Sequence, residues 1–162
     1  MIKFVAMSKT RILVHIVFST KYRQPTISLN HKRRLYAYIH GIIQKYRCKT
    51  LRINGLADHV HILLDLHPSV ALAILVKEIK QSTSLWMKNE NDFRKFTGWN
   101  EGYYAASIGS NEEGACVQYI MNQDASHGEK DFITEIKLLA MEYRLDWDEC
   151  DWSATPRGVD SP

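Results

Sequence analysis

Apolar residues recur with two different periods along this chain, and the order of those periods restricts the folds that it can form. In residues 11–18 ("RILVHIVF") four apolar side chains occupy every second position, which is the period of a β-strand. From about residue 28 to residue 46 the apolar side chains return every three or four positions, which predicts an amphipathic helix. The first two predicted elements are therefore a strand and a helix.

Four more elements follow from the same two periods. Residues 49–66 ("KTLRINGLADHVHILLDL") predict two strands joined by a tight turn, and residues 67–87 predict a second helix that is capped at Ser69. Residues 103–109 ("YYAASIG") predict a fourth strand. The order β-α-β-β-α-β is that of the split β-α-β, ferredoxin-like arrangement, so we predict an α+β fold with an antiparallel sheet.

Two additional helices are predicted after this unit. Ser110 stands three residues before Glu113, which is the spacing of a capping box, and Gly128 is a suitable helix stop. A last amphipathic helix carries Phe132 and Tyr143 near the two ends of its apolar side. The predicted fold is therefore the ferredoxin-like unit with two C-terminal helices added.

The composition is that of a globular protein with one domain. Of the 162 residues, 45% are hydrophobic and 24% are charged. No apolar run approaches the roughly 18 residues of a membrane span, and the N-terminus lacks the pattern of a signal peptide. Cys48, Cys116 and Cys150 fit neither a disulfide framework nor a zinc site, so we expect reduced thiols in the cytoplasm. We predict one domain over residues 1–145 and an acidic, loosely ordered tail over residues 146–162.

The charged residues are distributed unevenly between the two halves of the chain. Residues 1–81 contain 14 Lys and Arg but 3 Asp and Glu, whereas residues 82–162 contain 7 and 15 of these two groups. Tyrosines are interleaved with the cations in "KYR" and "KYRCK". A basic half of this kind suits a polyphosphate partner such as nucleic acid, and a solvated basic helix explains the same charges equally well.

Two histidines lie inside a strongly hydrophobic predicted strand ("DHVHILLDL"). His59 and His61 are two residues apart, so a strand places both imidazoles on one face of the sheet. The same face would also carry His15, Arg52 and Asn54, and we expect it to lie opposite the first two helices. This face is too polar for an ordinary core. Two imidazoles that point into one space are a common beginning of a metal site, although buried histidines bonded to nearby carbonyls are common as well.

A second candidate element is "YIMNQ" in the third predicted helix. Tyr119 and Gln123 are four residues apart and share one face of that helix. A half-buried tyrosine that only packs against the core, followed by a surface glutamine, would show the same spacing. The pair alone therefore indicates little about function.

The order of these elements resembles a known family. A His-hydrophobic-His strand, then the strand "GYYAASIG", then a helix with Tyr119 and Gln123 is similar to the single-tyrosine HUH transposases of small insertion sequences that move as single-stranded DNA, the IS200-like transposases. Further matching pieces are "HIVFSTKYRQP", "KQSTSLWMKN", "WNEGYYAASIG", "YIMNQDASH" and "DFITEI". The chain departs from its relatives at Ser126 and His127, where they often carry paired histidines and a basic residue.

The resemblance implies a metal-dependent site and a covalent mechanism. His59, His61 and Gln123 would bind Mg²⁺ or Mn²⁺, and Tyr119 would be the catalytic nucleophile. The implied reaction is cleavage and rejoining of single-stranded DNA at hairpin-bearing element ends, through a 5′-phosphotyrosine intermediate. Relatives form dimers in which the active site can be shared between subunits, so a homodimer is implied too.

The residues that contact DNA are predicted from charge and position. The candidates lie after the first strand, on the first helix and on the second strand: Lys21, Tyr22, Arg23, Lys32, Arg33 and Arg52. Trp99 would either stack on an unpaired base or cover the edge of the core. Other functions are open: a domesticated relative that processes chromosomal repeats, a non-catalytic nucleic-acid-binding domain, or a nuclease that uses water.

Overall fold

The computed structural model describes residues 8–124 and 131–146, and it shows the predicted order of elements. Four strands form one antiparallel sheet in the spatial order β2-β3-β1-β4. The strands and helices are β1 (Leu13–Ser19), α1 (Lys32–Lys45), β2 (Lys49–Leu56), β3 (His59–Asp65), α2 (Leu72–Lys88), β4 (Tyr104–Ile108), α3 (Glu113–Met121) and α4 (Phe132–Glu142). Four short 3₁₀ turns lie between them: η1 (Lys21–Arg23), η2 (Asn91–Phe93), η3 (Ser110–Glu112) and η4 (Asn122–Asp124). The predicted ferredoxin-like α+β fold is therefore confirmed.

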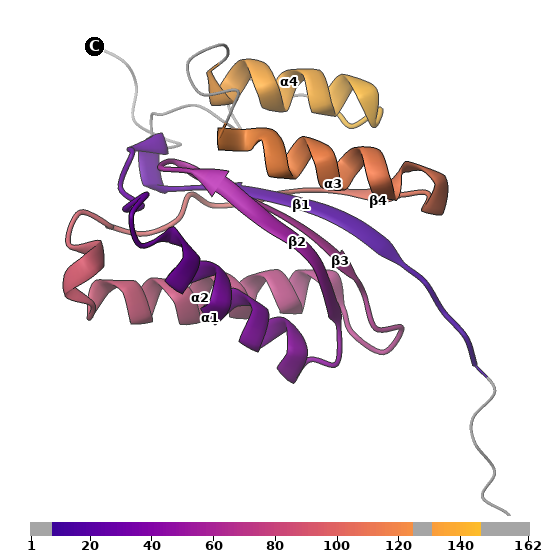
Figure 1. Cartoon of the computed structure of the whole chain (residues 1–162), viewed down its shortest axis with the longest axis horizontal. Coiled ribbons are helices and arrows are strands. Elements are labelled where there is room, and N and C mark those ends of the chain that lie inside the picture. The colour runs from indigo at the N-terminus through magenta and orange to yellow at the C-terminus, as the bar shows by residue number, and fades with distance from the viewer. Residues whose placement is uncertain (1–7, 125–130, 147–162) are drawn as a thin grey trace, which may run out of the picture.

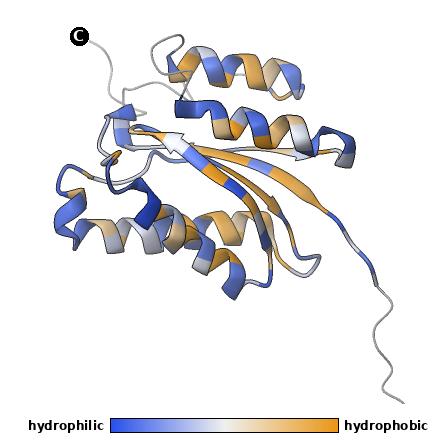
Figure 2. Cartoon of the chain, in the orientation of Figure 1, coloured by the Kyte–Doolittle hydropathy of each residue, from blue (hydrophilic) through white to orange (hydrophobic). Residues whose placement is uncertain are grey.

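Helices cover both faces of the sheet. Figure 1 shows α1 and α2 on one side and α3 with α4 on the other, so the sheet is the middle of three layers. The main apolar core lies between the sheet and the first helix pair, where residues such as Ile16, Leu35 and Ile79 are fully buried. Hydrophobic residues colour most of the length of the inner strands in Figure 2. A strand that is buried on both faces accounts for the nearly continuous apolar run around His61.

The opposite face of the sheet is polar and yet closed to solvent. His15, Asn54, His59 and His61 lie on it, and all four are buried. Arg52, which was expected on the same face, is exposed. The second helix pair supplies the cover, with apolar residues of α3 and α4 packed around the polar side chains. A polar cluster enclosed in this way must satisfy its own hydrogen bonds and charges.

Two predicted helix caps are wrong in detail. α2 begins at Leu72, and Ser69 instead places its hydroxyl 2.7 Å from His67 Nδ1. α3 begins at Glu113 without a side-chain cap, because the preceding residues form a 3₁₀ turn and the Ser110 hydroxyl accepts a hydrogen bond from Arg11. The predicted stop at Gly128 and almost all of the predicted tail lie outside the described residues. Within the described ranges, none of the helices is long and apolar enough to cross a bilayer.

Gly55 in the β2–β3 hairpin allows the two strands to approach closely. A Cβ at this position would lie 2.2 Å from the carbonyl oxygen of His59 and 2.9 Å from the Cα of Val60. These neighbours are backbone atoms, so they cannot move aside as a flexible side chain would. We predict that Gly55→Ala lowers the free energy of unfolding by about 1–3 kcal/mol or more. Urea denaturation would measure this change.

Gly41→Ala is the matched control for this substitution. Gly41 lies on the exposed side of α1 and has no neighbour within 4 Å of the added Cβ. The control should stabilise the protein by about 0.5–1 kcal/mol, because alanine favours the helix. Equal stability of the two variants would contradict the close approach at Gly55.

Candidate metal centre and tyrosine

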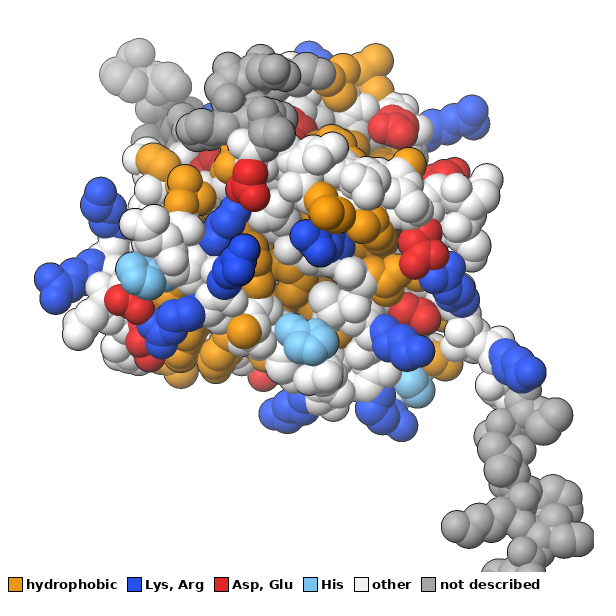
Figure 3. Space-filling model, viewed as in Figure 1, with side chains coloured by type: hydrophobic (Ala, Val, Ile, Leu, Met, Phe, Trp, Pro, Cys, Tyr) orange, Lys and Arg blue, Asp and Glu red, His pale blue; other side chains and the backbone are white. Residues whose placement is uncertain are grey.

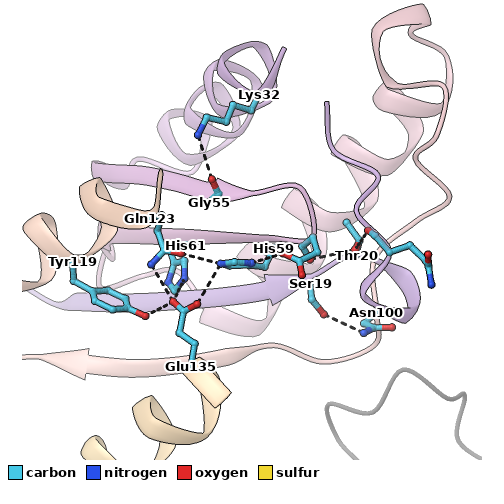
Figure 4. Close-up of polar contacts among 12 residues, drawn as sticks. Ser19, Thr20, Lys32, Gly55, His59, His61, Asn100, Tyr119, Gln123 and Glu135 are labelled. Atoms are coloured by element: carbon cyan, nitrogen blue, oxygen red, sulfur yellow. Dashed lines mark hydrogen bonds and ion pairs between the residues drawn. The ribbon is translucent and has the colours of Figure 1, made fainter. Parts of the chain in front are cut away.

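The two histidines of the HUH motif enter the polar layer from β3. In the antiparallel ladder His59 pairs with Ser19 and His61 pairs with Val17, so both are anchored to the central strand β1. Their side chains are 1% and 0% exposed, and their ring centroids are 5.0 Å apart. Figure 4 shows the two rings pointing toward the same group of side chains from α3, η4 and α4. The period of two predicted this arrangement from the sequence.

His59 is held at both ring nitrogens. Nδ1 lies 2.7 Å from a carboxylate oxygen of Asp58, and Nε2 lies 3.0 Å from Oε1 of Gln123. The ring also stacks on Phe132 with 4.5 Å between the centroids. Burial lowers the pKa of His59, but the hydrogen bond and charge of Asp58, together with Glu135 and Gln123, outweigh burial and raise the pKa above its ordinary value. Two oxygens thus face the two nitrogens, which favours a positive charge at this imidazole or beside it.

His61 lies deeper and has different partners. Nδ1 is 2.9 Å from Nε2 of His15, a buried histidine of β1, and Nε2 is 3.0 Å from Oε1 of Glu135. The second contact is close but is not aligned as a hydrogen bond. Burial lowers the pKa of His61 despite the carboxylate, and burial together with His61 lowers the pKa of His15 to about 3. The pair is therefore neutral at ordinary pH.

Glu135 of α4 is the residue that sequence reasoning missed. Its carboxylate accepts hydrogen bonds from the Tyr119 hydroxyl and, at 3.0 Å, from Nε2 of Gln123. The same carboxylate lies 3.8 Å from Nε2 of His59. Burial alone would raise the pKa of Glu135, yet its close contacts with His61, His59 and Tyr119 outweigh burial and lower the pKa to about 2. The carboxylate is thus ionised and lies in the middle of the cluster.

A local signal for Glu135 was present in the sequence. It lies in "DFITEI", three residues after Phe132 and one before Ile136, and both of these residues are buried. Asp131 caps the helix by accepting a hydrogen bond from the backbone of Thr134, which fixes the first turn. A carboxylate next to the apolar stripe of a helix must lie near the buried boundary. The direction of the Glu135 carboxylate becomes clear only from the packing of α4 on the polar face of the sheet.

Tyr119 lies on the inner side of α3. Its ring is half-buried, with the ring centroid 5.5 Å from that of His61, and its hydroxyl donates to Glu135. Burial, followed by the charge of Glu135, raises the pKa of the phenol well above its ordinary value. Figure 4 shows Tyr119, Gln123 and Glu135 gathered around His61. All of these side chains belong to one chain.

The donor set fits a divalent cation with mixed ligands. His59, His61 and Glu135 offer ligand atoms that all lie within 4.8 Å of one another, and Gln123 adds an amide oxygen at 3.0 Å from His59 Nε2. Adjacent ligands of an octahedral ion are about 3.0 Å apart when the bonds are about 2.1 Å long, as for Mg²⁺. The buried Nε2 of His61 also lacks an aligned hydrogen bond among the described residues. Two imidazole nitrogens and a carboxylate oxygen form a mixed donor set that several divalent cations accept.

The predicted DNA contacts occupy different environments. Lys21 and Tyr22 are exposed, Arg23 is half-buried, and Arg33 and Arg52 are exposed on α1 and β2. Lys32 is engaged within the chain, where its ammonium pairs with Asp124. Figure 3 shows Lys and Arg side chains spread over the face that carries α1. Trp99 covers the core edge, as one of its two interpretations predicted: it packs on Phe18 and donates to Thr83 at 3.0 Å.

Taken together, fold and site define a ferredoxin-like α+β protein in which two strand histidines, a helix tyrosine and two further polar side chains form one buried centre. The family described as "Transposase IS200 like" matches residues 8–123. The chain therefore belongs to the IS200-like transposase family, the single-tyrosine HUH relatives that its motifs predicted. Glu135 lies beyond the matching segment.

Individual relatives agree with this assignment. The chain is 25% identical over 114 residues to the transposases of insertion sequence IS200 from Salmonella typhimurium and from Salmonella typhi, a match that covers 67% of this chain and 75% of each relative. Two solved structures share the fold. One is a putative transposase from Deinococcus radiodurans, with TM-score 0.55, 20% identity, and coverage of 75% of this chain and 98% of that chain. The other is a REP-associated tyrosine transposase bound to a REP hairpin, with TM-score 0.59, 15% identity, and coverage of 99% and 100%.

Glu135→Gln tests whether the carboxylate takes part in cation binding. We predict that this substitution weakens Mn²⁺ binding by about 10- to 100-fold, because an anionic donor becomes neutral at the same size. Isothermal titration calorimetry would measure the affinity. The His59→Ala, His61→Ala double variant should abolish the binding.

Glu142→Gln provides the control, since Glu142 lies on the same helix and is exposed. Its affinity for Mn²⁺ should match that of the unmodified protein. A Glu135→Gln variant that binds Mn²⁺ as tightly as Glu142→Gln would remove Glu135 from the proposed set of ligands.

Proposed function

We propose that this protein is a transposase that cuts and rejoins single-stranded DNA through a covalent bond to Tyr119. This proposal rests on one observation: the Tyr119 hydroxyl lies in the same cluster as the two HUH imidazoles, and the carboxylate that accepts its hydrogen bond, Glu135, is 3.0 Å from His61 Nε2. Membership in the IS200-like family supports a DNA-nicking and DNA-joining enzyme. His59, His61, Gln123 and Glu135 are the residues that would hold Mg²⁺ or Mn²⁺.

The chemistry assigned to the chain's own residues is nucleophilic substitution at phosphorus. A bound divalent cation would supply Lewis-acid stabilisation of the phosphate oxygens. The Tyr119 phenol gives its proton to water as its oxygen forms the new bond to phosphorus. The bond from phosphorus to the 3′ oxygen breaks, and the strand leaves as a 3′-OH after gaining a proton. The hydroxyl bond to Glu135 orients the phenol for this attack. Because the tyrosine ester replaces the broken ester bond, the phosphodiester linkage is conserved and a second 3′-OH can reverse the step without ATP.

A strained basic turn lies beside the site and is a suitable surface for the DNA strand. Tyr22 and Arg23 both have positive φ, 55° and 54°, which is costly for residues with side chains. The backbone of Tyr22 donates to the Asn100 side chain at 3.0 Å, and that of Lys21 donates to the Gly98 carbonyl at 2.8 Å. The turn directly follows β1, whose last residue pairs with His59. It thus presents the exposed Lys21 and Tyr22 near the metal centre.

The proposed substrate is single-stranded DNA that carries a hairpin. The fold neighbour that was solved with a REP hairpin spans nearly the whole of this chain, including the region of α4 that the IS200-like match leaves out. This coverage favours a second candidate, a relative that processes chromosomal repeats. Hairpins from element ends and from repeats that flank the gene itself, tested in parallel, would separate the two.

We propose that one protomer can supply every side chain of the site. Tyr119, Gln123 and Glu135 of the same chain meet His59 and His61. A single cleavage therefore requires one protomer in this arrangement. Excision of two ends requires two such sites, and we propose a homodimer for that reaction, with exchange of the tyrosine-bearing helix as a further option.

Tyr119→Phe tests the nucleophile. We predict that labelled single-stranded hairpin DNA with Mg²⁺ gives a protein–DNA adduct that survives denaturing electrophoresis, and that Tyr119→Phe gives none, because a phenyl ring has no oxygen to attack phosphorus. Tyr143→Phe is the control, since Tyr143 packs near the same cluster without contacting Glu135 in any described hydrogen bond. It should retain the adduct.

Each rival function has its own result in this assay. Cleavage that persists in Tyr119→Phe without an adduct would identify a nuclease that uses water. Hairpin binding without cleavage by the unmodified protein would identify a non-catalytic binding domain. Either outcome would refute the proposed mechanism.

Salt dependence tests the basic turn. We predict that Lys21→Ala reduces the slope of log affinity against log salt concentration by about 0.7–0.9, as expected when one phosphate contact is lost. Binding of a labelled hairpin strand at several salt concentrations would measure it. Lys77→Ala, on the exposed side of α2, should leave the slope unchanged. An unchanged slope in Lys21→Ala would exclude this contact.

A further inference from the structure

The buried side-chain amide of Asn54, on β2, binds the C-terminal end of α3, the helix that carries Tyr119. Asn54 is 7% exposed, and its Nδ2 donates to the backbone carbonyls of Ile120 at 3.0 Å and Met121 at 3.3 Å. These carbonyls belong to the last turn of α3, where helical hydrogen bonds run out. Asn54 therefore acts as a side-chain cap that comes from the sheet rather than from the helix itself.

A lysine completes the arrangement. Lys32 donates to Oδ1 of Asn54 at 3.1 Å and to the carbonyl of Gly55 at 3.3 Å, and its ammonium also pairs with Asp124. Figure 4 shows Lys32 of α1 reaching toward the backbone at Gly55. Both ends of the Asn54 side chain are thus engaged, so the amide has one orientation. We call the set Asn54, Lys32 and Asp124 the bracket.

The bracket contacts the chain before and after Gln123: Asn54 binds the carbonyls of Ile120 and Met121, and Lys32 pairs with Asp124. Ile120 directly follows Tyr119, and Asp124 directly follows Gln123. Each of the two site residues is therefore followed in sequence by a residue that the bracket binds. α3 has nine residues, too few for a stable helix on its own. Its other supports are apolar packing through Cys116 and Ile120, the ion pair of Glu113 with Arg11 in the first turn, and the hydrogen bond from Tyr119 to Glu135. Apolar contacts have little directionality, so they hold the helix on the sheet without fixing its rotation.

We propose that Asn54 is a positioning residue that fixes the rotation and height of the tyrosine-bearing helix over the HUH pair. This inference rests on the proposed function for its catalytic consequence. A displacement of about 1 Å at a reacting group can lower a rate about 100-fold. The bracket therefore sets the rate of attack by Tyr119, while DNA affinity depends on other surfaces. The bracket also explains why the ammonium of Lys32, a predicted DNA contact, binds Asn54 and Asp124 within the protein.

Asn54→Asp is the test variant. It keeps the size and the oxygen that accepts from Lys32, and it removes the donor to the two carbonyls. Asn89→Asp is the matched control, because Asn89 donates in the same way to the carbonyl of Leu85 at the end of α2. Both variants would be compared by amide hydrogen exchange with mass spectrometry, without DNA, and by the rate of adduct formation with the hairpin strand.

We expect peptides that cover residues 119–124 to exchange at least about 10-fold faster in Asn54→Asp and at the ordinary rate in Asn89→Asp. Adduct formation should slow by about 10- to 100-fold at saturating DNA, while the KM for DNA is unchanged. Equal exchange in the two variants would overturn the positioning role. If the unmodified protein forms no adduct, the proposed function fails, and the exchange result still decides whether Asn54 positions α3.

Lys32→Met is the second variant, and it preserves the Asn54 donor if Asn54→Asp does not fold. It should raise exchange at residues 122–124 and leave the salt slope of DNA binding unchanged. A fall of that slope by about 0.7–0.9 would show that Lys32 binds phosphate, which would overturn its place in the bracket.

Discussion

The interaction on which the rest of the structure depends is the buried contact between the carboxylate of Glu135 and the imidazoles of β3. A carboxylate and two imidazoles in one enclosed layer are costly unless they satisfy one another, because the charged form loses its hydration there. Here His61, Tyr119 and Gln123 all reach the same carboxylate. The polar face of the sheet is stable under its helices because those helices bring its partners.

This requirement explains why the two layers of side chains, one on each face of the sheet, differ in composition. The layer between α1, α2 and the sheet is apolar and supplies the hydrophobic stabilisation of the domain. The layer under α3 and α4 contains a smaller apolar lining around a polar centre. In such a layer, hydrogen bonds fix directions that packing leaves free. The contacts of Asn54 with the end of α3 are one example.

The sequence predicted the fold well because each strand and helix carries its period locally. The two histidines could be placed on one face for the same reason. Tyr119 and Gln123 were predicted on one helix, but α3 ends at Met121 and Gln123 belongs to the 3₁₀ turn η4 that follows it. Glu135 could not be placed, since its role arises only when α4 folds back over β3 from a distant part of the chain. The caps at Ser69 and Ser110 failed because nearby side chains, His67 and Arg11, bind those hydroxyls instead.

The contact between His15 and His61 has a further consequence for the placement of protons. If Nε2 of His61 offers its lone pair to a cation, the proton of that ring resides on Nδ1 and is donated to Nε2 of His15. His15 must then carry its own proton on Nδ1, which has no hydrogen-bond partner among the described residues. Two neutral rings on neighbouring strands are thereby locked into one tautomeric pattern. Cation binding through Nε2 of His61 would therefore be linked to the proton position of a histidine on the neighbouring strand.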